Sequence, residues 1–308
     1  MRRGSPDVSV GHQLTDFAYA TGWAAVRRMP ESAAYAMFDR FADGIWSRRG
    51  KQILQFEKNL RRIMPEADEE AIREASKAGM RSYFTYWCDA FRMPDWPKER
   101  ILGLDPIGEH HIADALANGK GLVVVSPHAG NYDHGAAFLA QKYGSMTTVM
   151  ERLKPESLFE RFVEFRESLG MEVRGTGEPN VIDLLTDRVA ANRIVCLVGD
   201  RDLSRRGVPV TFFGEQTKMP PGPAVTALRT GAPLLAVSFW YEGRTSRCEV
   251  FPPVDFPRDA PKSEAIAIAT QKIADDLARG IGRRPVDWHM LQRLWLADLD
   301  PNRAPRDG

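Results

Sequence analysis

The spacing of hydrophobic residues changes once along the chain and divides it into two sections. Up to residue 119, apolar positions recur every three or four residues, which is the period of an amphipathic helix. The first such segment carries Leu14, Phe17 and Trp23 among its apolar positions, and Arg27 and Arg28 follow near its end. Cations at this position are stabilised by the negative end of the helix dipole. The pattern predicts helices over 12–29, 32–49, 51–63 and 68–93.

After Gly121, short apolar runs alternate with segments of helical period. Residues 122–125 form one such run, which is typical of a parallel strand buried on both faces. Strands are expected over 121–126, 146–150, 193–198 and 233–240, and helices over 131–142, 155–169, 181–191, 222–230 and 262–281. The alternation predicts an α/β fold with a mostly parallel central sheet flanked by helices, preceded by an N-terminal helical section.

The length of 308 residues allows one domain with a large core. We expect a single domain over 1–308, with a mainly helical section over 1–119, an α/β core over 120–296 and a tail over 297–308. Hydrophobic residues make up 43% and charged residues 27%, which excludes global disorder. The balance of 42 Lys and Arg against 41 Asp and Glu argues against a dedicated nucleic-acid-binding protein.

The cysteines and the apolar runs bear on the cellular compartment. Cys88, Cys196 and Cys248 are widely spaced and odd in number, so they indicate neither a disulfide framework nor a zinc site and suit a reducing compartment. No stretch approaches the ~20 consecutive apolar residues of a membrane-spanning helix. The basic residues at 1–3 are not followed by a long apolar run, so we expect no secretory signal.

Positive charge is concentrated near the N-terminus. Residues 1–64 hold 11 Lys and Arg against 6 Asp and Glu, whereas the remainder holds 31 against 35. A basic section on a nearly neutral protein is a candidate surface for anionic lipid headgroups, and it would make the helical section membrane-facing. A solvated basic helix face explains the same charges equally well.

Polar residues follow three of the expected strands. Ligands collect at the carboxyl ends of parallel strands, where this chain places His128, Glu151 and Asp200. His128 stands at the beginning of the 131–142 helix, whose positive end disfavours a second positive charge. A neutral imidazole there can accept a proton from an alcohol, with Asp133 or Asp200 as the carboxylate that orients it. A histidine that only caps the helix, with Asp133 binding first-turn N–H groups, is the structural alternative.

Arg166 lies on the apolar face of the 155–169 helix, in line with Phe159 and Phe162. A cation on an inward face needs an anionic partner, and we expect Glu151 or Asp200 to supply it. The same arginine suits binding of a phosphate or ordering of the catalytic carboxylates.

Four sequence blocks together resemble a known family. The segment from Val124 through His128 to Asp133 is similar to the His-x-x-x-x-Asp motif of glycerolipid acyltransferases. With the three further blocks, the chain resembles the lipid A late-acyltransferase family up to about residue 296, and within it the actinobacterial members that acylate phosphatidylinositol mannosides. Those further blocks are Glu151-Arg152-Leu153-Lys154, Asp200-Arg201-Asp202 and Val210-Thr211-Phe212-Phe213-Gly214.

The resemblance implies an acyl-CoA-dependent enzyme, peripheral at the cytoplasmic face of the plasma membrane. It would move a long fatty acyl chain to a mannose hydroxyl of a phosphatidylinositol mannoside. Acyl-CoA is then a co-substrate, and no metal or other cofactor is implied, because a thioester is already activated. Its expected partners are acyl-CoA, the glycolipid and an anionic membrane surface bound through the N-terminal helices.

The resemblance also implies roles for individual residues. His128 would be the general base, and Asp200 is favoured as the carboxylate beside it. Asp133 would be structural or secondary, and Asp202 is a further candidate for the relay. The family pattern has a glutamate in this block, so Asp200 is one methylene shorter. The substrate-binding candidates are Glu151, Arg166, Arg201 and Asp202.

Other classes of protein would require different motifs. The chain lacks the Gly-x-Ser-x-Gly elbow of α/β hydrolases and an early Gly-x-Gly-x-x-Gly dinucleotide motif. A metallohydrolase using His128, Asp133, His134 and Asp200 stays open, as does an acyltransferase for another glycolipid or a lysophospholipid. A non-enzymatic lipid carrier at the membrane periphery is the remaining alternative, and it would not need His128.

Overall fold

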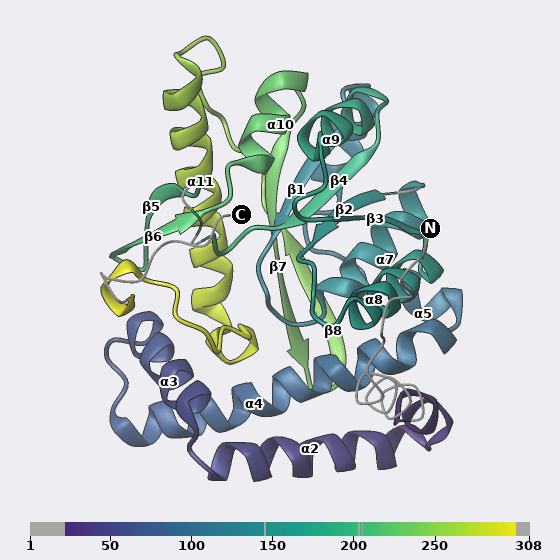
Figure 1. Cartoon of the computed structure of the whole chain (residues 1–308), viewed down its shortest axis with the longest axis vertical. Coiled ribbons are helices and arrows are strands. Elements are labelled where there is room, and N and C mark those ends of the chain that lie inside the picture. The colour runs from purple at the N-terminus through teal and green to yellow at the C-terminus, as the bar shows by residue number, and fades with distance from the viewer. Residues whose placement is uncertain (1–21, 145, 203, 205, 300–308) are drawn as a thin grey trace, which may run out of the picture.

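The computed structural model describes residues 22–299 apart from 145, 203 and 205 (Figure 1). The first predicted helix lies partly outside this range, but residues 22–28 are helical. Most of the predicted tail also lies outside it. Asp298, within the predicted tail, is packed, because its side chain is 1% exposed and binds Arg62 at 2.8 Å. The packed body therefore extends beyond the predicted boundary at 296.

The N-terminal helical section consists of α2 (Glu31–Ser47), α3 (Lys51–Ile63) and the long α4 (Glu69–Arg92), followed by η1 (Met93–Asp95), α5 (Lys98–Leu102) and α6 (His110–Ala117). Asp68 begins α4 by accepting a hydrogen bond from the N–H of Ala71 at 2.8 Å. Pro94 stands two residues after Arg92, within η1, because a proline lacks the N–H that would continue the α-helix. α2 packs along α4, and Figure 1 shows both beneath the ends of the sheet strands.

The central sheet has six strands in the order β3-β2-β4-β1-β7-β8. They are β1 (Leu122–Ser126), β2 (Met146–Met150), β3 (Met171–Gly175), β4 (Ile194–Val198), β7 (Leu234–Glu242) and β8 (Thr245–Val250). All neighbours are parallel except β7 and β8, which pair antiparallel. The predicted fold class is confirmed.

The structure adds strands that the hydrophobic pattern did not predict. β3 and β8 are edge strands in which buried and less buried positions alternate, so neither shows an unbroken apolar run. β5 (Val208–Phe212) and β6 (Glu215–Met219) form a separate hairpin. Phe213 and Gly214 make its turn with positive φ angles of 50° and 77°.

Helices cover both faces of the sheet (Figure 1). α7 (Tyr132–Tyr143) and α8 (Glu156–Ser168) join α6 on one face, and α9 (Val181–Ala190), α10 (Gly222–Thr230) and α11 (Lys262–Arg283) lie on the other. Val124 packs into the first layer, whereas Val123 and Val125 pack into the second. β1 is thus buried on both faces, as its apolar run predicts.

No helix within the described residues combines the length and the apolar character that crossing a bilayer requires.

Candidate active site

The strand ends bring His128 and Asp200 together. β1 and β4 are parallel neighbours, with Ser126 opposite Val198 at their carboxyl ends. The N–H of Gly199 donates to the carbonyl of Ser126 at 2.9 Å and continues the pairing one step further. His128 and Asp200 each stand two residues beyond their strand, so the register places them side by side.

Asp200 binds both the ring and the backbone of His128. Its Oδ1 lies 2.6 Å from Nδ1 of the imidazole, and its Oδ2 accepts the N–H of His128 at 3.0 Å. The indole N–H of Trp288 also donates to Oδ2, at 2.9 Å. Asp200 is fully buried, whereas the side chain of His128 is 45% exposed. Because Nδ1 is held by the carboxylate, Nε2 is the nitrogen left for proton transfer.

The electrostatics of this pair favour an imidazole that accepts a proton. Burial lowers the pKa of His128, but the Asp200 carboxylate more than compensates, so the pKa lies above its usual value. Burial likewise raises the pKa of Asp200, and the contacts with His128 and Trp288 outweigh it, so this pKa lies below its usual value. Asp200 therefore stays ionised and stabilises the imidazolium that proton uptake would form.

The loop after His128 is fixed from two sides. Gly130 has a φ of 49°, and a Cβ there would lie 2.7 Å from the backbone of Phe239, so a larger residue does not fit. Asn131 begins α7 by accepting the N–H of His134 at 2.9 Å. Its amide donates to the buried Asp89 at 3.0 Å, and two tyrosine hydroxyls also donate to this carboxyl. Burial raises the pKa of Asp89 to about 6, despite these hydrogen bonds.

Asp133 pairs with Arg166 and not with His128. The guanidinium donates from Nε to Oδ1 of Asp133 at 2.8 Å, and Tyr86 donates its hydroxyl to Oδ2 at 2.8 Å. The prediction that Glu151 or Asp200 is the partner of Arg166 was wrong. α8 lies beside α7 on one face of the sheet, so its inward side meets the first turn of α7. The ring of Tyr132, the residue before Asp133, lies 6.0 Å from that of His128.

The remaining predicted residues follow the carboxyl ends of β2 and β4. Glu151 is exposed at the end of β2. Asp202 binds within its own loop, where its Oδ1 accepts the N–H of Ser204 at 2.7 Å. Arg201 follows Asp200 directly, and its charge opposes protonation of His128. Of the three candidate relay acids, Asp200 is the one that contacts the histidine.

Residues 285–299, here named the C-terminal segment, complete the site, and sequence reasoning missed them. Ala129 and Trp288 form an antiparallel bridge, and the N–H of His289 donates to the carbonyl of His128 at 2.7 Å. The ring of His289 is buried, which lowers its pKa to about 3, and the charge of His128 adds to the effect. The segment contains no strand or regular α-helix, so no periodic pattern pointed to it.

The four residues of the metallohydrolase alternative do not converge. Asp133 is engaged with Arg166, and the Nε2 of His134 lies 3.1 Å from the carbonyl of Ile101. Within residues 22–299, leaving aside the three undescribed positions, no group of three or more His, Cys, Asp or Glu side chains is arranged to hold a metal ion.

A small apolar cavity lies between the sheet and α7. Its volume is about 20 Å³, which is room for about one water molecule. Gly135 and Phe239 line it, together with Val124 and Leu235 of the sheet. An acyl chain could enter this space only if the surrounding side chains moved apart.

Comparison with known proteins agrees with the resemblance that the sequence blocks indicated. The family model described as bacterial lipid A biosynthesis acyltransferase matches residues 1–297. A protein of Mycolicibacterium smegmatis named phosphatidylinositol mannoside acyltransferase is 43% identical over 304 residues, covering 98% of each chain. A protein of the same name from Mycobacterium tuberculosis strain CDC 1551 is 43% identical over 303 residues, covering 97% of this chain and 94% of its own. The chain therefore belongs to the bacterial lipid A biosynthesis acyltransferase family, which places it among acyltransferases.

Proposed function

We propose that this protein transfers a long fatty acyl chain from acyl-CoA to a mannose hydroxyl of a phosphatidylinositol mannoside. The observation that carries the proposal is the contact of 2.6 Å between His128 and the buried, ionised Asp200, with the imidazole half exposed. The names of the mycobacterial relatives support the choice of acceptor.

His128 acts as the general base in this reaction. Its Nε2 takes the hydroxyl proton while the sugar oxygen attacks the thioester carbonyl. Collapse of the tetrahedral intermediate breaks the carbon–sulfur bond, and the departing thiolate takes the proton from the imidazolium. The products are the sugar ester and CoA. Asp200 holds the Nδ1–H tautomer and stabilises the imidazolium between the two proton transfers. No metal or acyl-enzyme takes part.

We further propose that the protein works peripherally at the cytoplasmic face of the plasma membrane. α2 exposes Phe41 and Ile45, which are 52% and 40% accessible, and α3 exposes Leu54, which is 46% accessible. These apolar side chains lie within the basic section 1–64. Exposed apolar residues among cations suit the interface of an anionic membrane.

The test is mass spectrometry of lipids after incubation with palmitoyl-CoA and a phosphatidylinositol mannoside. The wild type should form the acylated mannolipid, and His128→Ala should lose ~10²–10⁴ of the rate while still binding acyl-CoA. His110→Ala, at an exposed histidine of α6, is the matched control and should keep full turnover. Acylation of a lysophospholipid instead would favour the other acceptor class. Lipid exchange that survives His128→Ala, without any acylated product, would identify a carrier and refute the proposal.

A further inference from the structure

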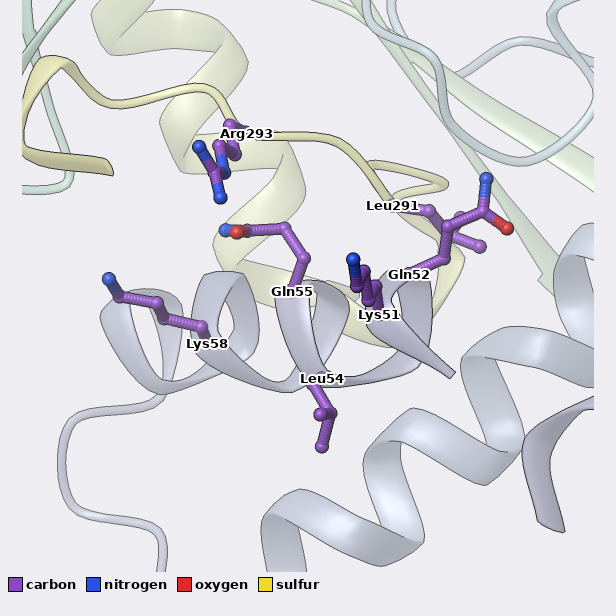
Figure 2. Close-up of a pocket in the computed structure, with 7 residues that line it drawn as sticks. All are labelled: Lys51, Gln52, Leu54, Gln55, Lys58, Leu291 and Arg293. Atoms are coloured by element: carbon purple, nitrogen blue, oxygen red, sulfur yellow. The ribbon is translucent and has the colours of Figure 1, made fainter. Parts of the chain in front are cut away.

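A basic groove lies between α3 and the C-terminal segment (Figure 2). Its volume is about 570 Å³, and Lys51, Lys58 and Arg293 contribute three cations to its lining, which includes no acidic residue. On α3, Lys51, Gln55 and Lys58 project toward the segment that carries Arg293, whereas Leu54 projects to another side of the helix. The groove is thus a concave surface of one charge sign.

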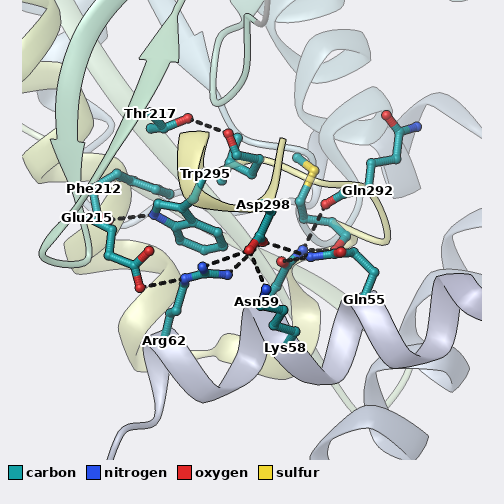
Figure 3. A network of polar contacts seen from close by, with 12 residues as sticks. Gln55, Lys58, Asn59, Arg62, Phe212, Glu215, Thr217, Gln292, Trp295 and Asp298 are labelled. Atoms are coloured by element: carbon teal, nitrogen blue, oxygen red, sulfur yellow. Dashed lines mark hydrogen bonds and ion pairs between the residues drawn. The ribbon is translucent and has the colours of Figure 1, made fainter. Parts of the chain in front are cut away.

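The three cations differ in whether a carboxylate pairs with them. Lys58 binds Asp298 at 2.5 Å, and Arg62 binds Asp298 and Glu215 at 2.8 and 2.7 Å, so this network is balanced (Figure 3). Lys51 and Arg293 are exposed, and neither contacts an acidic side chain in the described part of the chain. The groove therefore carries two uncompensated positive charges, which favour an anion with several oxygen atoms.

The wall that carries Arg293 is held rigidly. The amide of Asn59, on α3, donates to the carbonyls of Met290 and Gln292 at 2.7 and 2.9 Å. Thr217 donates to the carbonyl of Leu294 at 2.8 Å, immediately after Arg293 (Figure 3). Fixing the backbone on both sides of an arginine lowers the ordering cost of binding a ligand.

The same wall leads to the candidate active site. His289, whose N–H binds the carbonyl of His128, precedes Leu291 by two residues and Arg293 by four. The Cα atoms of His289 and Arg293 are therefore at most about 14 Å apart. A ligand with its phosphate in the groove and sugar rings beyond it would extend along this wall toward His128.

We propose that this groove binds the phosphate of an anionic lipid headgroup through Lys51 and Arg293 and thereby orients the attached sugar toward His128. The inference rests on the proposed glycolipid acceptor. A lipid source is favoured over the phosphates of CoA because Leu54 is exposed on the same helix and Phe41 and Ile45 on the adjacent α2. A bilayer against these apolar residues would bring its phosphate groups to the level of the flanking cations.

The test compares Lys51→Ala with Arg293→Ala, singly and together. Each removes one positive charge, and Lys98→Ala with Lys262→Ala is the matched control, since both lysines are exposed at the first position of a helix, as Lys51 is. One readout is binding to phosphatidylcholine vesicles that contain phosphatidylinositol. The other is the separate determination of kcat, KM for the mannolipid and KM for palmitoyl-CoA.

We expect each groove substitution to weaken vesicle binding and to raise the KM for the mannolipid by about fivefold, with kcat and the KM for palmitoyl-CoA unchanged. Arg293→Lys should restore most of the loss, because it restores the charge.

Three results would overturn the inference: an equal loss in the control pair, a rise confined to the KM for palmitoyl-CoA, or no change at all. A wild type that acylates no mannolipid would refute the proposed function instead, while the vesicle assay would still decide whether the groove binds a lipid phosphate.

Discussion

The indole N–H of Trp288 donates to Oδ2 of Asp200 at 2.9 Å, and both side chains are fully buried. Asp200 thus has one oxygen held by Trp288 and the other by the ring of His128. Because a hydrogen bond to a buried carboxylate is worth more than one to a neutral group, Trp288 fixes both the position and the charge of Asp200.

Trp288→Phe should lower kcat by about tenfold or more, since a hydrogen bond to a charged group is worth about 1.5–3 kcal/mol. Trp295→Phe is the matched control. Its indole is equally buried but donates to the carbonyl of Phe212 at 2.8 Å, away from Asp200. Thermal unfolding should show similar losses of stability in both variants, with the larger loss of turnover in Trp288→Phe. Equal losses of kcat would mean that Trp288 acts only through packing.

The dependence of kcat/KM on pH should report the titration of His128. The base works only when neutral, so activity should rise as pH increases through its pKa, which lies above the usual value. Asp200→Asn removes the carboxylate that raises this pKa, so the acidic limb should move to lower pH while the plateau falls. Steady-state assays across the pH range check both effects. A limb that stays in place would show that another group controls it.

The buried pair of Asp133 and Arg166 should behave as a unit in unfolding. Their side chains are 3% and 12% exposed, so removing one partner leaves an uncompensated buried charge. Asp133→Asn or Arg166→Met should each lower the free energy of unfolding by about 3–5 kcal/mol. The double variant should lower it by less than the sum of the two single losses. Arg229→Met breaks an ion pair with Asp183 whose side chains are 49% and 64% exposed, and it should cost less than about 1 kcal/mol. Urea denaturation measures the free energy of unfolding of all four variants. Additive losses for the Asp133 and Arg166 substitutions would contradict the coupling.

The exposed apolar residues of α2 should contribute to membrane binding. Ile45→Ser should weaken sedimentation with anionic vesicles by about fivefold, because it removes an apolar side chain from the interface. Ile107→Ser is the matched control, since Ile107 is 60% exposed but lies outside α2 and α3. The control should bind as the wild type does. If both variants weakened binding equally, α2 would not be the membrane-facing element.

The strands that the sequence predicted correctly are those buried on both faces. β1 and β4 are continuous apolar runs because helices cover both of their sides. β3 and β8 were missed because buried and less buried positions alternate along them, so neither carries an unbroken apolar run. The same limit applies to η2 (Pro285–Asp287) and the irregular residues after it, which have no period to detect.

By itself, the sequence determined the fold class and the two strand ends that carry His128 and Asp200. Hydrophobic period is a local property, so the strands and the residues that follow them can be predicted from the sequence. That β1 and β4 are neighbours, and that His128 therefore meets Asp200, was decided by the pairing of the strands in the sheet. Only the tertiary structure decided that Arg166 binds Asp133, that Trp288 binds Asp200 and that Lys51 faces Arg293 across a groove. Those relationships depend on how helices and an irregular segment pack in three dimensions, and packing joins residues that share no pattern along the chain.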